Sequence, residues 1–394
     1  MGAIKLRAWW WHRQGLDGSL MGATCPEVLE RSGWARSLGG ANTYLTLFSR
    51  AGCSRASVDN ALARLDIHEL PSARGATYVV PAPDFGLALQ VGRGASRGEV
   101  RQAGKLGFSS IEIEQLCETV RKELEHAGEP LDANQLRERL GDKIQSFGVA
   151  GRKAGLASPL PVVLGLLQER GTIRRVPADG RLDSTRLTYM AWDDPPTDVG
   201  SDEQAHVELV RRYLSWTGPA GIDHMRWFTG FGTRALRAAV SMLDAREVEP
   251  GLWLLPELLD EFESYVAPKD PSYSLVSWID ALALLRRDIT GIVAPQDLSI
   301  VLPDGKPVGE LKDFPHHLII DRGRVVGFWE FDPSAGAVVW APFAKVHRQL
   351  LEAAVERTEK FIVDQLGDAR GSILDTPQVR QPRIAAVRAF ANLA

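Results

Sequence analysis

The chain has 394 residues, of which 44% are hydrophobic and 24% charged, a composition typical of a globular protein with roughly two or three domains. Its 46 basic and 50 acidic side chains give a formal net charge of −4, so a nucleic-acid surface would need local clustering of charge. No apolar run of about 18 residues predicts a transmembrane helix, and no signal-peptide pattern opens the chain. Three widely spaced cysteines argue against a disulfide scaffold and a zinc site. We therefore expect a cytoplasmic protein without a metal or other cofactor.

The first segment, residues 1–104, predicts several helices followed by a strand. Helical patterns cover residues 6–14 and 26–32, and an apolar run over 42–50 ends at Gly52. Apolar residues at helical spacing follow Ser54. The β-branched stretch 77–80 then predicts a strand. Helices followed by a strand are the order of a winged-helix unit.

The same order recurs twice. Residues 105–196 predict three helices and a hairpin with a polar tip at 177–184, which is the pattern of a winged helix-turn-helix. Residues 201–266 predict three further helices and a hairpin that turns at Pro250-Gly251. These segments predict tandem winged helix-turn-helix units.

The last segment, residues 267–394, changes character. Strand-like runs over 298–302, 317–320, 324–331 and 337–340 are separated by turn signals. A helix over 345–366 follows them. The predicted fold class is therefore α+β, with tandem winged helices, a C-terminal antiparallel β unit and a closing helix.

Two groups of residues are candidates for DNA contact. Winged helices usually place the third helix in the major groove and the wing on the backbone, which makes Arg174, Arg175 and Arg181 of the second hairpin candidates. The alternative is an ordinary solvated face. Trp10 and Trp11, with Arg13 beside them, could stack on an unstacked base or wedge into a duplex. The alternative for the tryptophans is packing against a neighbouring domain.

Several sequence blocks together resemble the AlkZ/YcaQ superfamily of bacterial DNA glycosylases. The blocks keep the family's order and extend over nearly the whole chain: NTYLTLFSRAG (42–52), ARGATYVVPAPDF (73–85), HVELVRRYLSWTGPAGIDHMRWFTG (206–230), SWIDALALLRRD (277–288) and FPHHLIIDRGRVVGFWEFDP (314–333). The resemblance implies tandem winged helices around a concave basic DNA surface. It also implies hydrolytic removal of bulky alkylated bases, including interstrand crosslinks.

The chain departs from this family at the catalytic motif. The family carries Gln-x-Gln or Gln-x-Asp just before the first block, whereas this chain has Arg36 and Leu38 at the corresponding positions. A histidine of the second block is replaced by Tyr78. Either another polar group has taken over, or the chemistry has been lost.

The chemistry indicates which residues could replace the motif. Cleavage of an N-glycosidic bond passes through an oxocarbenium-like state, which needs nearby negative charge and a positioned water. Asn42 is the candidate for holding the water; the alternative is a turn residue after Gly39-Gly40. Further candidates near the motif position are the polar residues Ser37 and Tyr44, the carboxylates Asp59 and Asp84, for which helix capping is the alternative, and the DNA-contacting Arg36 and Arg74.

Two functions fit these observations. The first is a monofunctional DNA glycosylase, acting as a monomer on double-stranded DNA, that excises an alkylated or crosslinked base or a hypermodified base of phage DNA. In the latter case the enzyme would serve in anti-phage defence. Lys5 is the only lysine before Lys105, which argues against a Schiff-base mechanism in the first segment. The second is a non-catalytic winged-helix transcriptional regulator.

Overall fold

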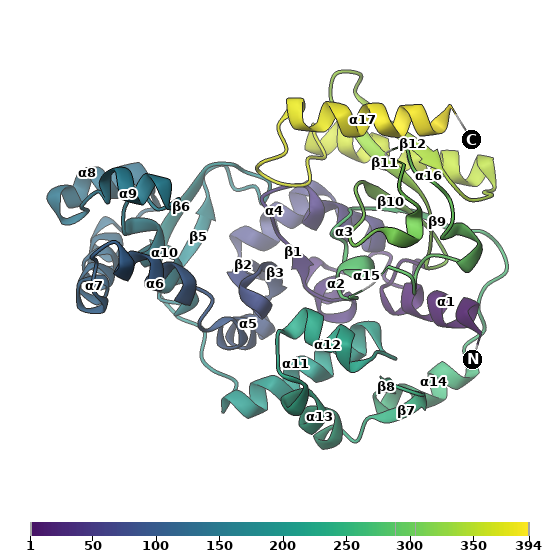
Figure 1. Cartoon of the computed structure of the whole chain (residues 1–394), viewed down its shortest axis with the longest axis horizontal. Helices are drawn as coiled ribbons and strands as arrows, with labels where there is room; N and C mark the ends of the chain where they lie inside the picture. The colour runs from purple at the N-terminus through teal and green to yellow at the C-terminus, as the bar shows by residue number, and fades with distance from the viewer. Residues whose placement is uncertain (1, 288, 304, 393–394) are drawn as a thin grey trace.

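The computed structural model describes residues 2–287, 289–303 and 305–392. A smaller lobe, formed by residues 97–191, extends to the left of Figure 1, and the remaining chain forms a larger body. Helices and small antiparallel sheets share the described part of the chain, which confirms the predicted α+β class. No described helix is long and apolar enough to cross a membrane.

The first part of the body combines helices with a three-stranded sheet of order β1-β3-β2. Gly52 ends one helix in the left-handed conformation, with φ of 72°. Ser54 caps the next helix, because its side chain accepts a hydrogen bond from Ser57 N. The elements are α1 (Ala3–Arg13), α2 (Cys25–Ser32), β1 (Ala35–Arg36), α3 (Asn42–Ala51), α4 (Arg55–Ala63), β2 (Ile67–Pro71), β3 (Thr77–Pro81) and α5 (Phe85–Gly92).

The lobe repeats this order around its own hydrophobic core. Its longest helix begins with a capping box formed by Ser109 and Glu112 and ends at the left-handed Gly128. The sheet has the order β4-β6-β5. The elements are α6 (Arg97–Lys105), α7 (Ser110–Ala127), β4 (Leu131–Asp132), α8 (Ala133–Leu140), α9 (Gly148–Lys153), α10 (Leu160–Glu169), β5 (Ile173–Pro177) and β6 (Leu187–Ala191).

The third segment has three helices followed by a two-stranded hairpin. An isolated bridge joins Ala220 to Trp253 of the hairpin, at the position that a first strand occupies in the other two segments. The elements are α11 (Asp202–Thr217), α12 (Ile222–Thr229), α13 (Thr233–Met242), β7 (Arg246–Glu249), β8 (Leu252–Leu254) and α14 (Leu259–Ser264).

The C-terminal segment forms a sheet of order β12-β11-β10-β9. The prediction of a strand over 298–302 is wrong, because Pro295–Asp297 forms a 3-10 turn and Val301 makes only an isolated bridge to Pro307. The edge strand β9 and the last helix α17 were not predicted. The elements are β9 (Tyr273–Val276), α15 (Ala281–Leu284), β10 (His317–Asp321), β11 (Arg324–Asp332), β12 (Ala337–Pro342), α16 (Arg348–Phe361), which continues as a π-helical turn (Ile362–Leu366), and α17 (Pro377–Ala391).

The first and last segments share a hydrophobic core. One buried cluster contains Tyr44 and Val79 together with Trp329 and Phe361. A fully buried ion pair also crosses this boundary, because Nη1 and Nη2 of Arg50 on α3 each donate to the Asp280 carboxylate at 2.8 Å. The β1–α3 region is therefore supported by residues more than 200 positions away.

Candidate functional site

The loop between β1 and α3, residues 37–41, occupies the region of the missing family motif. Ser37 N donates to Thr77 O of β3 at 3.0 Å, which holds the start of the loop. Asn42 begins α3, and its Nδ2 donates to the Arg36 carbonyl at 2.6 Å. The Asn42 side chain is buried, and its Oδ1 accepts no hydrogen bond from the residues that the structure describes. The ends of the loop are thus tied together, with one buried acceptor unused.

A largely buried carboxylate lies against this loop. The Ser37 hydroxyl donates a short hydrogen bond to Oε1 of Glu69 on β2. The other oxygen, Oε2, accepts a hydrogen bond at 2.8 Å from Nη1 of Arg175 on β5. The Glu69 side chain is only 9% exposed. The carboxylate is therefore held between a hydroxyl of the body and a guanidinium of the lobe.

Sequence reasoning missed Glu69. It lies 32 positions after Ser37 and 106 before Arg175, so no local pattern could reveal its partners. The available signal was an acidic residue inside a short strand segment, since such a charge needs a partner when it is buried. That signal indicates burial with a partner rather than a particular role.

Arg36 and Arg74 form a basic edge beside the loop. Arg36 Nη1 donates to Thr77 O at 2.8 Å, and its guanidinium lies 5.4 Å from the centre of the Tyr78 ring. Burial lowers the pKa of the Arg36 guanidinium. Arg74 is exposed, lies 3.9 Å from the Trp227 ring centre and donates to Trp227 O at 2.6 Å. Arg74 thus connects the first segment to the third.

Tyr44 and Asp59 belong to a different set of contacts. The Tyr44 hydroxyl donates to Asp59 Oδ1 at 2.6 Å and accepts a hydrogen bond from Leu182 N at 2.9 Å. Its ring is fully buried. Burial raises the pKa of the Asp59 carboxyl, and burial also raises the pKa of Tyr44. Both residues therefore hold the tip of the β5–β6 loop against the body, and the contacts do not join them to Ser37.

Arg181 lies in the same β5–β6 tip. Its Nε and Nη2 donate to Asp183 at 2.8 and 2.7 Å, and Nη2 also donates to Leu366 O at 3.0 Å. A short hydrogen bond joins Arg370 to the Asp183 carbonyl. The predicted wing tip is thus docked on the protein and Arg181 is engaged in an ion pair there, and its contact with the DNA backbone stays a prediction.

Trp10 and Trp11 are buried in α1, at 5% and 4% exposure. The Arg286 guanidinium lies 3.3 Å from the centre of the Trp10 ring. The prediction that these tryptophans stack on a base is therefore wrong, and the alternative of packing against another part of the chain holds. Arg13 donates to Ser215 O at 3.1 and 2.8 Å through Nε and Nη2, which also ties it to the body.

Two further candidates take other positions. Asp84 is buried, accepts a hydrogen bond from Trp34 Nε1 at 2.8 Å and pairs with Arg212 at 2.8 Å. Burial raises the pKa of its carboxyl. Arg174 is half-buried on β5 next to Arg175, and burial lowers the pKa of Arg174. Within residues 2–287, 289–303 and 305–392, no group of three or more His, Cys, Asp or Glu side chains could hold a metal ion.

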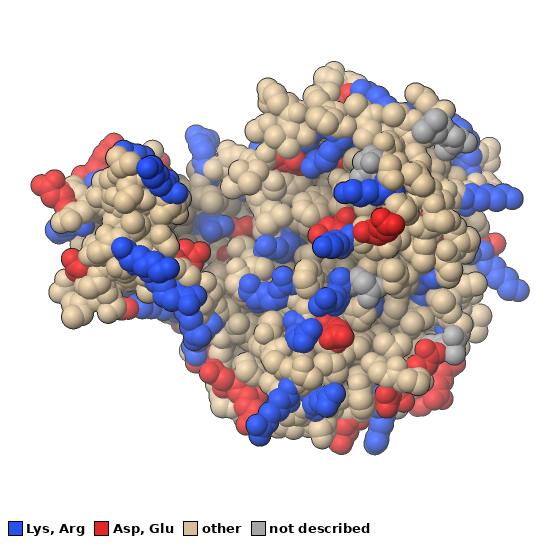
Figure 2. Space-filling model, in the orientation of Figure 1, with Lys and Arg blue, Asp and Glu red and all other residues tan. Residues whose placement is uncertain are grey.

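Basic side chains gather on one face of the molecule. Figure 2 shows Lys and Arg along the edge of the lobe that borders the hollow between lobe and body, and again on the body across that hollow. Clustered positive charge next to a concave surface attracts a polyanion despite the net charge of −4. This face is the candidate DNA-binding surface.

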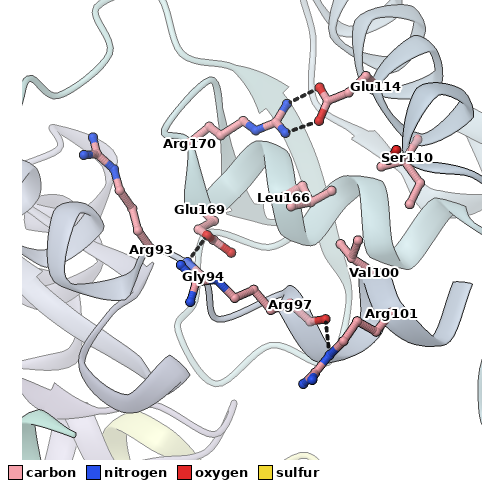
Figure 3. Close-up of a pocket in the computed structure, with 11 residues that line it drawn as sticks. Arg93, Gly94, Arg97, Val100, Arg101, Ser110, Glu114, Leu166, Glu169 and Arg170 are labelled. Atoms are coloured by element: carbon pink, nitrogen blue, oxygen red, sulfur yellow. Dashed lines mark hydrogen bonds and ion pairs between the residues drawn. The ribbon is translucent and has the colours of Figure 1, made fainter. Parts of the chain in front are cut away.

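A cavity of about 780 Å³ marks the junction of lobe and body on α6, α7 and α10. Figure 3 shows Arg170 paired with Glu114, while Glu169 accepts a hydrogen bond from the Gly94 backbone. Arg97 and Arg101 on α6 are exposed and have no carboxylate partner within the described part of the chain. These two guanidiniums are therefore available to an anionic ligand.

The chain belongs to the AlkZ-like DNA glycosylase family, whose family model matches residues 35–361. The superfamily resemblance drawn from the sequence blocks is thereby confirmed, and the family supports a glycosylase that acts on DNA. Among solved structures, Streptomyces sahachiroi DNA glycosylase AlkZ is similar, with a TM-score of 0.70 at 20% identity, over 94% of this chain and 98% of that one. No curated protein sequence matches the chain.

Proposed function

We propose that this protein is a monofunctional DNA glycosylase that removes a bulky modified base from double-stranded DNA. The base is an alkylated or crosslinked base, or a hypermodified base of phage DNA, in which case the enzyme serves in defence against phage. One observation carries the proposal: Glu69 and Ser37 form a hydrogen-bonded pair at the loop where the family's catalytic motif would lie. A carboxylate from β2 thus takes over from the missing Gln-x-Gln or Gln-x-Asp.

The chemistry assigns a role to each group. Negative charge on Glu69 stabilises the positive charge that develops on the sugar as the glycosidic bond breaks. Ser37 positions the carboxylate through its hydroxyl, and Arg175 holds the second oxygen from the lobe. The unused Oδ1 of Asn42 accepts a hydrogen bond from the attacking water. Water attacks the sugar carbon and the base leaves, so the products are a free base and an abasic site.

The position of the nearest lysine in the sequence also favours a hydrolytic mechanism over one that uses a lysine nucleophile. Lys5, the only lysine before Lys105, donates from Nζ to the Glu263 carbonyl at 2.9 Å. That contact directs its amine toward α14 instead of the β1–α3 loop. No Schiff base is therefore assigned to the first segment, and abasic sites should stay uncut until alkali is added.

We infer three winged-helix units from the order of elements. Helix, strand, further helices and a β-hairpin recur in the first segment and in the lobe, with two helices after the strand in the first segment and three in the lobe. The third segment has a single bridge in place of the first strand. The units correspond to residues 1–104, 105–196 and 201–266, followed by the β unit at 267–394. In this interpretation Arg36, Arg74, Arg97, Arg101 and Arg174 contact phosphates along one DNA-binding face.

The test uses genomic DNAs that carry different bases: unmodified, alkylated, and hydroxymethylated or glucosylated phage DNA. Abasic sites are assayed by alkaline cleavage, and the released base is identified by mass spectrometry. We expect abasic sites in one modified DNA only. Glu69→Gln should lower the rate by at least about a hundredfold, because it removes the charge that stabilises the transition state, while DNA affinity should be kept. Glu138→Gln, an exposed carboxylate on α8, is the matched control.

The alternative is a DNA-binding regulator without catalysis. The occupation of the motif positions by Arg36 and Leu38 favours it. It predicts tight binding to a defined operator, no abasic sites in any DNA, and no effect of Asn42→Ala on function. Tight binding without any released base would therefore overturn the glycosylase proposal.

A further inference from the structure

A short segment near the C-terminus presents two aliphatic side chains to solvent. Residues 367–376, which we call the strap, join the π-helical turn to α17. Ile373 and Leu374 in the strap are 51% and 77% exposed. Scattered exposed aliphatic residues are common, but these two are adjacent in sequence and lie next to the candidate site. The strap is also outside residues 35–361, which the family model matches.

The strap is joined directly to the β1–α3 loop. Ala41 N donates to Arg370 O at 2.8 Å, and Ile373 N donates to Leu38 O at 2.9 Å. Two glycines allow this close approach. A Cβ on Gly40 would lie 2.4 Å from Arg370 O, and a Cβ on Gly39 would lie 2.2 Å from Cγ2 of Ile373. The exposed aliphatic pair is therefore fixed beside the loop that carries Ser37.

Ion pairs make the strap rigid. Arg380 on α17 donates to both oxygens of Asp368, at 2.6 and 2.9 Å. Arg383 donates to both oxygens of Asp375, at 3.0 and 2.9 Å, and Asp375 also accepts a hydrogen bond from Gly371 N at 2.9 Å. Both ends of the strap are thus attached to α17. Ile373 and Leu374 at the tip of the strap can therefore contact a ligand while the strap keeps its conformation.

We propose that Ile373 and Leu374 form a wedge that enters between stacked base pairs of duplex DNA and opens the helix next to Ser37 and Glu69. Apolar side chains unstack a base step when they insert into it, and glycosylases that act on a duplex take the target nucleotide out of the stack. This inference rests on the proposed function to the extent that duplex DNA is the ligand. It requires no catalysis, so it can be tested on unmodified DNA.

The experiment measures base unstacking in the full-length protein. A short duplex with one 2-aminopurine is titrated with protein, and the rise in its fluorescence reports unstacking, while affinity is followed separately by anisotropy. Leu374→Ser should lose most of the fluorescence rise with affinity changed less than about threefold, since phosphate contacts supply most of the affinity. Leu374→Phe, which keeps an apolar side chain, should retain the rise. Val266→Ser, at 81% exposure, is the control for an exposed aliphatic residue elsewhere.

The outcomes separate the wedge from the glycosylase. A full fluorescence rise in Ile373→Ser/Leu374→Ser overturns the wedge, whether or not the protein releases a base. Loss of the rise supports the wedge even if no DNA yields abasic sites. Where a substrate is found, Leu374→Ser should be slower by about tenfold on paired DNA and recover on a duplex with a mismatch at the target, which is already partly unstacked. Failure to bind any duplex overturns both proposals.

Discussion

At the scale of single residues, buried polar groups connect distant segments of this chain. Glu69 is held by Ser37 from its own segment and by Arg175 from the lobe, and Arg50 is paired with Asp280. Each group would be costly to bury alone. The candidate site is therefore stabilised by contacts that form only when all segments are in place.

His68 is a second buried polar residue, and it should make stability depend on pH. Its ring nitrogens have no hydrogen-bond partner among the described residues, and burial lowers the pKa of His68 to about 3. In the unfolded chain the pKa is about 6.5. Between these values the unfolded state binds a proton that the folded state does not, so stability is lost as pH falls through this window.

We expect His68→Phe to remove this loss, because the ring already packs edge-on against Trp192 at 5.2 Å between ring centres. From pH 6.5 to 5.0 the wild type should lose about 2 kcal/mol of unfolding free energy through this group. Denaturant unfolding at several pH values measures the difference. The control is a substitution of the exposed His126. In His126→Asn the unfolding free energy should depend on pH as it does in the wild type. If the unfolding free energy of His68→Phe falls with decreasing pH as steeply as that of the wild type, the prediction is contradicted.

At the scale of elements, the tip of the β5–β6 hairpin is an integral part of the body surface. Tyr44, the Leu182 amide and Arg181 fasten it to α3 and to the end of the π-helical turn. A wing that contacts DNA is expected to be free. We expect the basic helix α6, which carries the exposed Arg97 and Arg101, to contact DNA beside the hollow instead.

Tyr44→Phe tests how firmly the tip is docked. The variant leaves Asp59 without its tyrosine donor and the Leu182 amide without an acceptor. We expect a loss of about 1–3 kcal/mol in unfolding free energy and faster amide hydrogen exchange in residues 178–186. Tyr189→Phe is the control, because no described residue hydrogen-bonds the Tyr189 hydroxyl. Unchanged exchange at the tip would show that the apolar contacts alone hold it.

The predicted elements were largely correct where local signals are strong. Ser109 and Gly128 marked the ends of α7, Gly52 marked the end of α3, and the Arg322-Gly323 turn separated β10 from β11. The cap of α4 is Ser54, not Ser57 as the sequence pattern suggested. The strand predicted from the apolar run at 298–302 does not form, because proline turns and the Asp297–Arg324 ion pair bend the chain there. The site was predicted only in part. Ser37 and Asn42 lie at one loop, but the docking of lobe on body, which brings Arg175 to Glu69, has no local signature.

At the scale of the whole molecule, the net charge of −4 conceals a basic face. Affinity for DNA should therefore depend on a few arginines and fall steeply with salt. Arg97 and Arg101 are the clearest pair, because both are exposed on α6.

The double variant Arg97→Ala/Arg101→Ala should bind every duplex more weakly, and the slope of log K against log salt should decrease by about one for each lost phosphate contact. Fluorescence anisotropy at a series of salt concentrations measures the slope. Arg121→Ala, whose guanidinium already pairs with Glu118 and Glu125 on the same helix, is the control. If the slope of log K against log salt is unaltered in the double variant, Arg97 and Arg101 do not contact DNA phosphates.

The lobe is fastened to the body at three places, one of which is the ion pair between Arg175 and Glu69. Glu169 holds the Gly94 and Ser96 amides at one end, and the hairpin tip docks on α3 and the strap at the other. We expect a lobe attached in this way to move little when it binds its ligand, so that shape adjustment falls to the nucleic acid. The energetic cost of bending then depends on the base steps being bent, with pyrimidine–purine steps the easiest to deform. Sequence preference can thus arise at positions that no side chain touches.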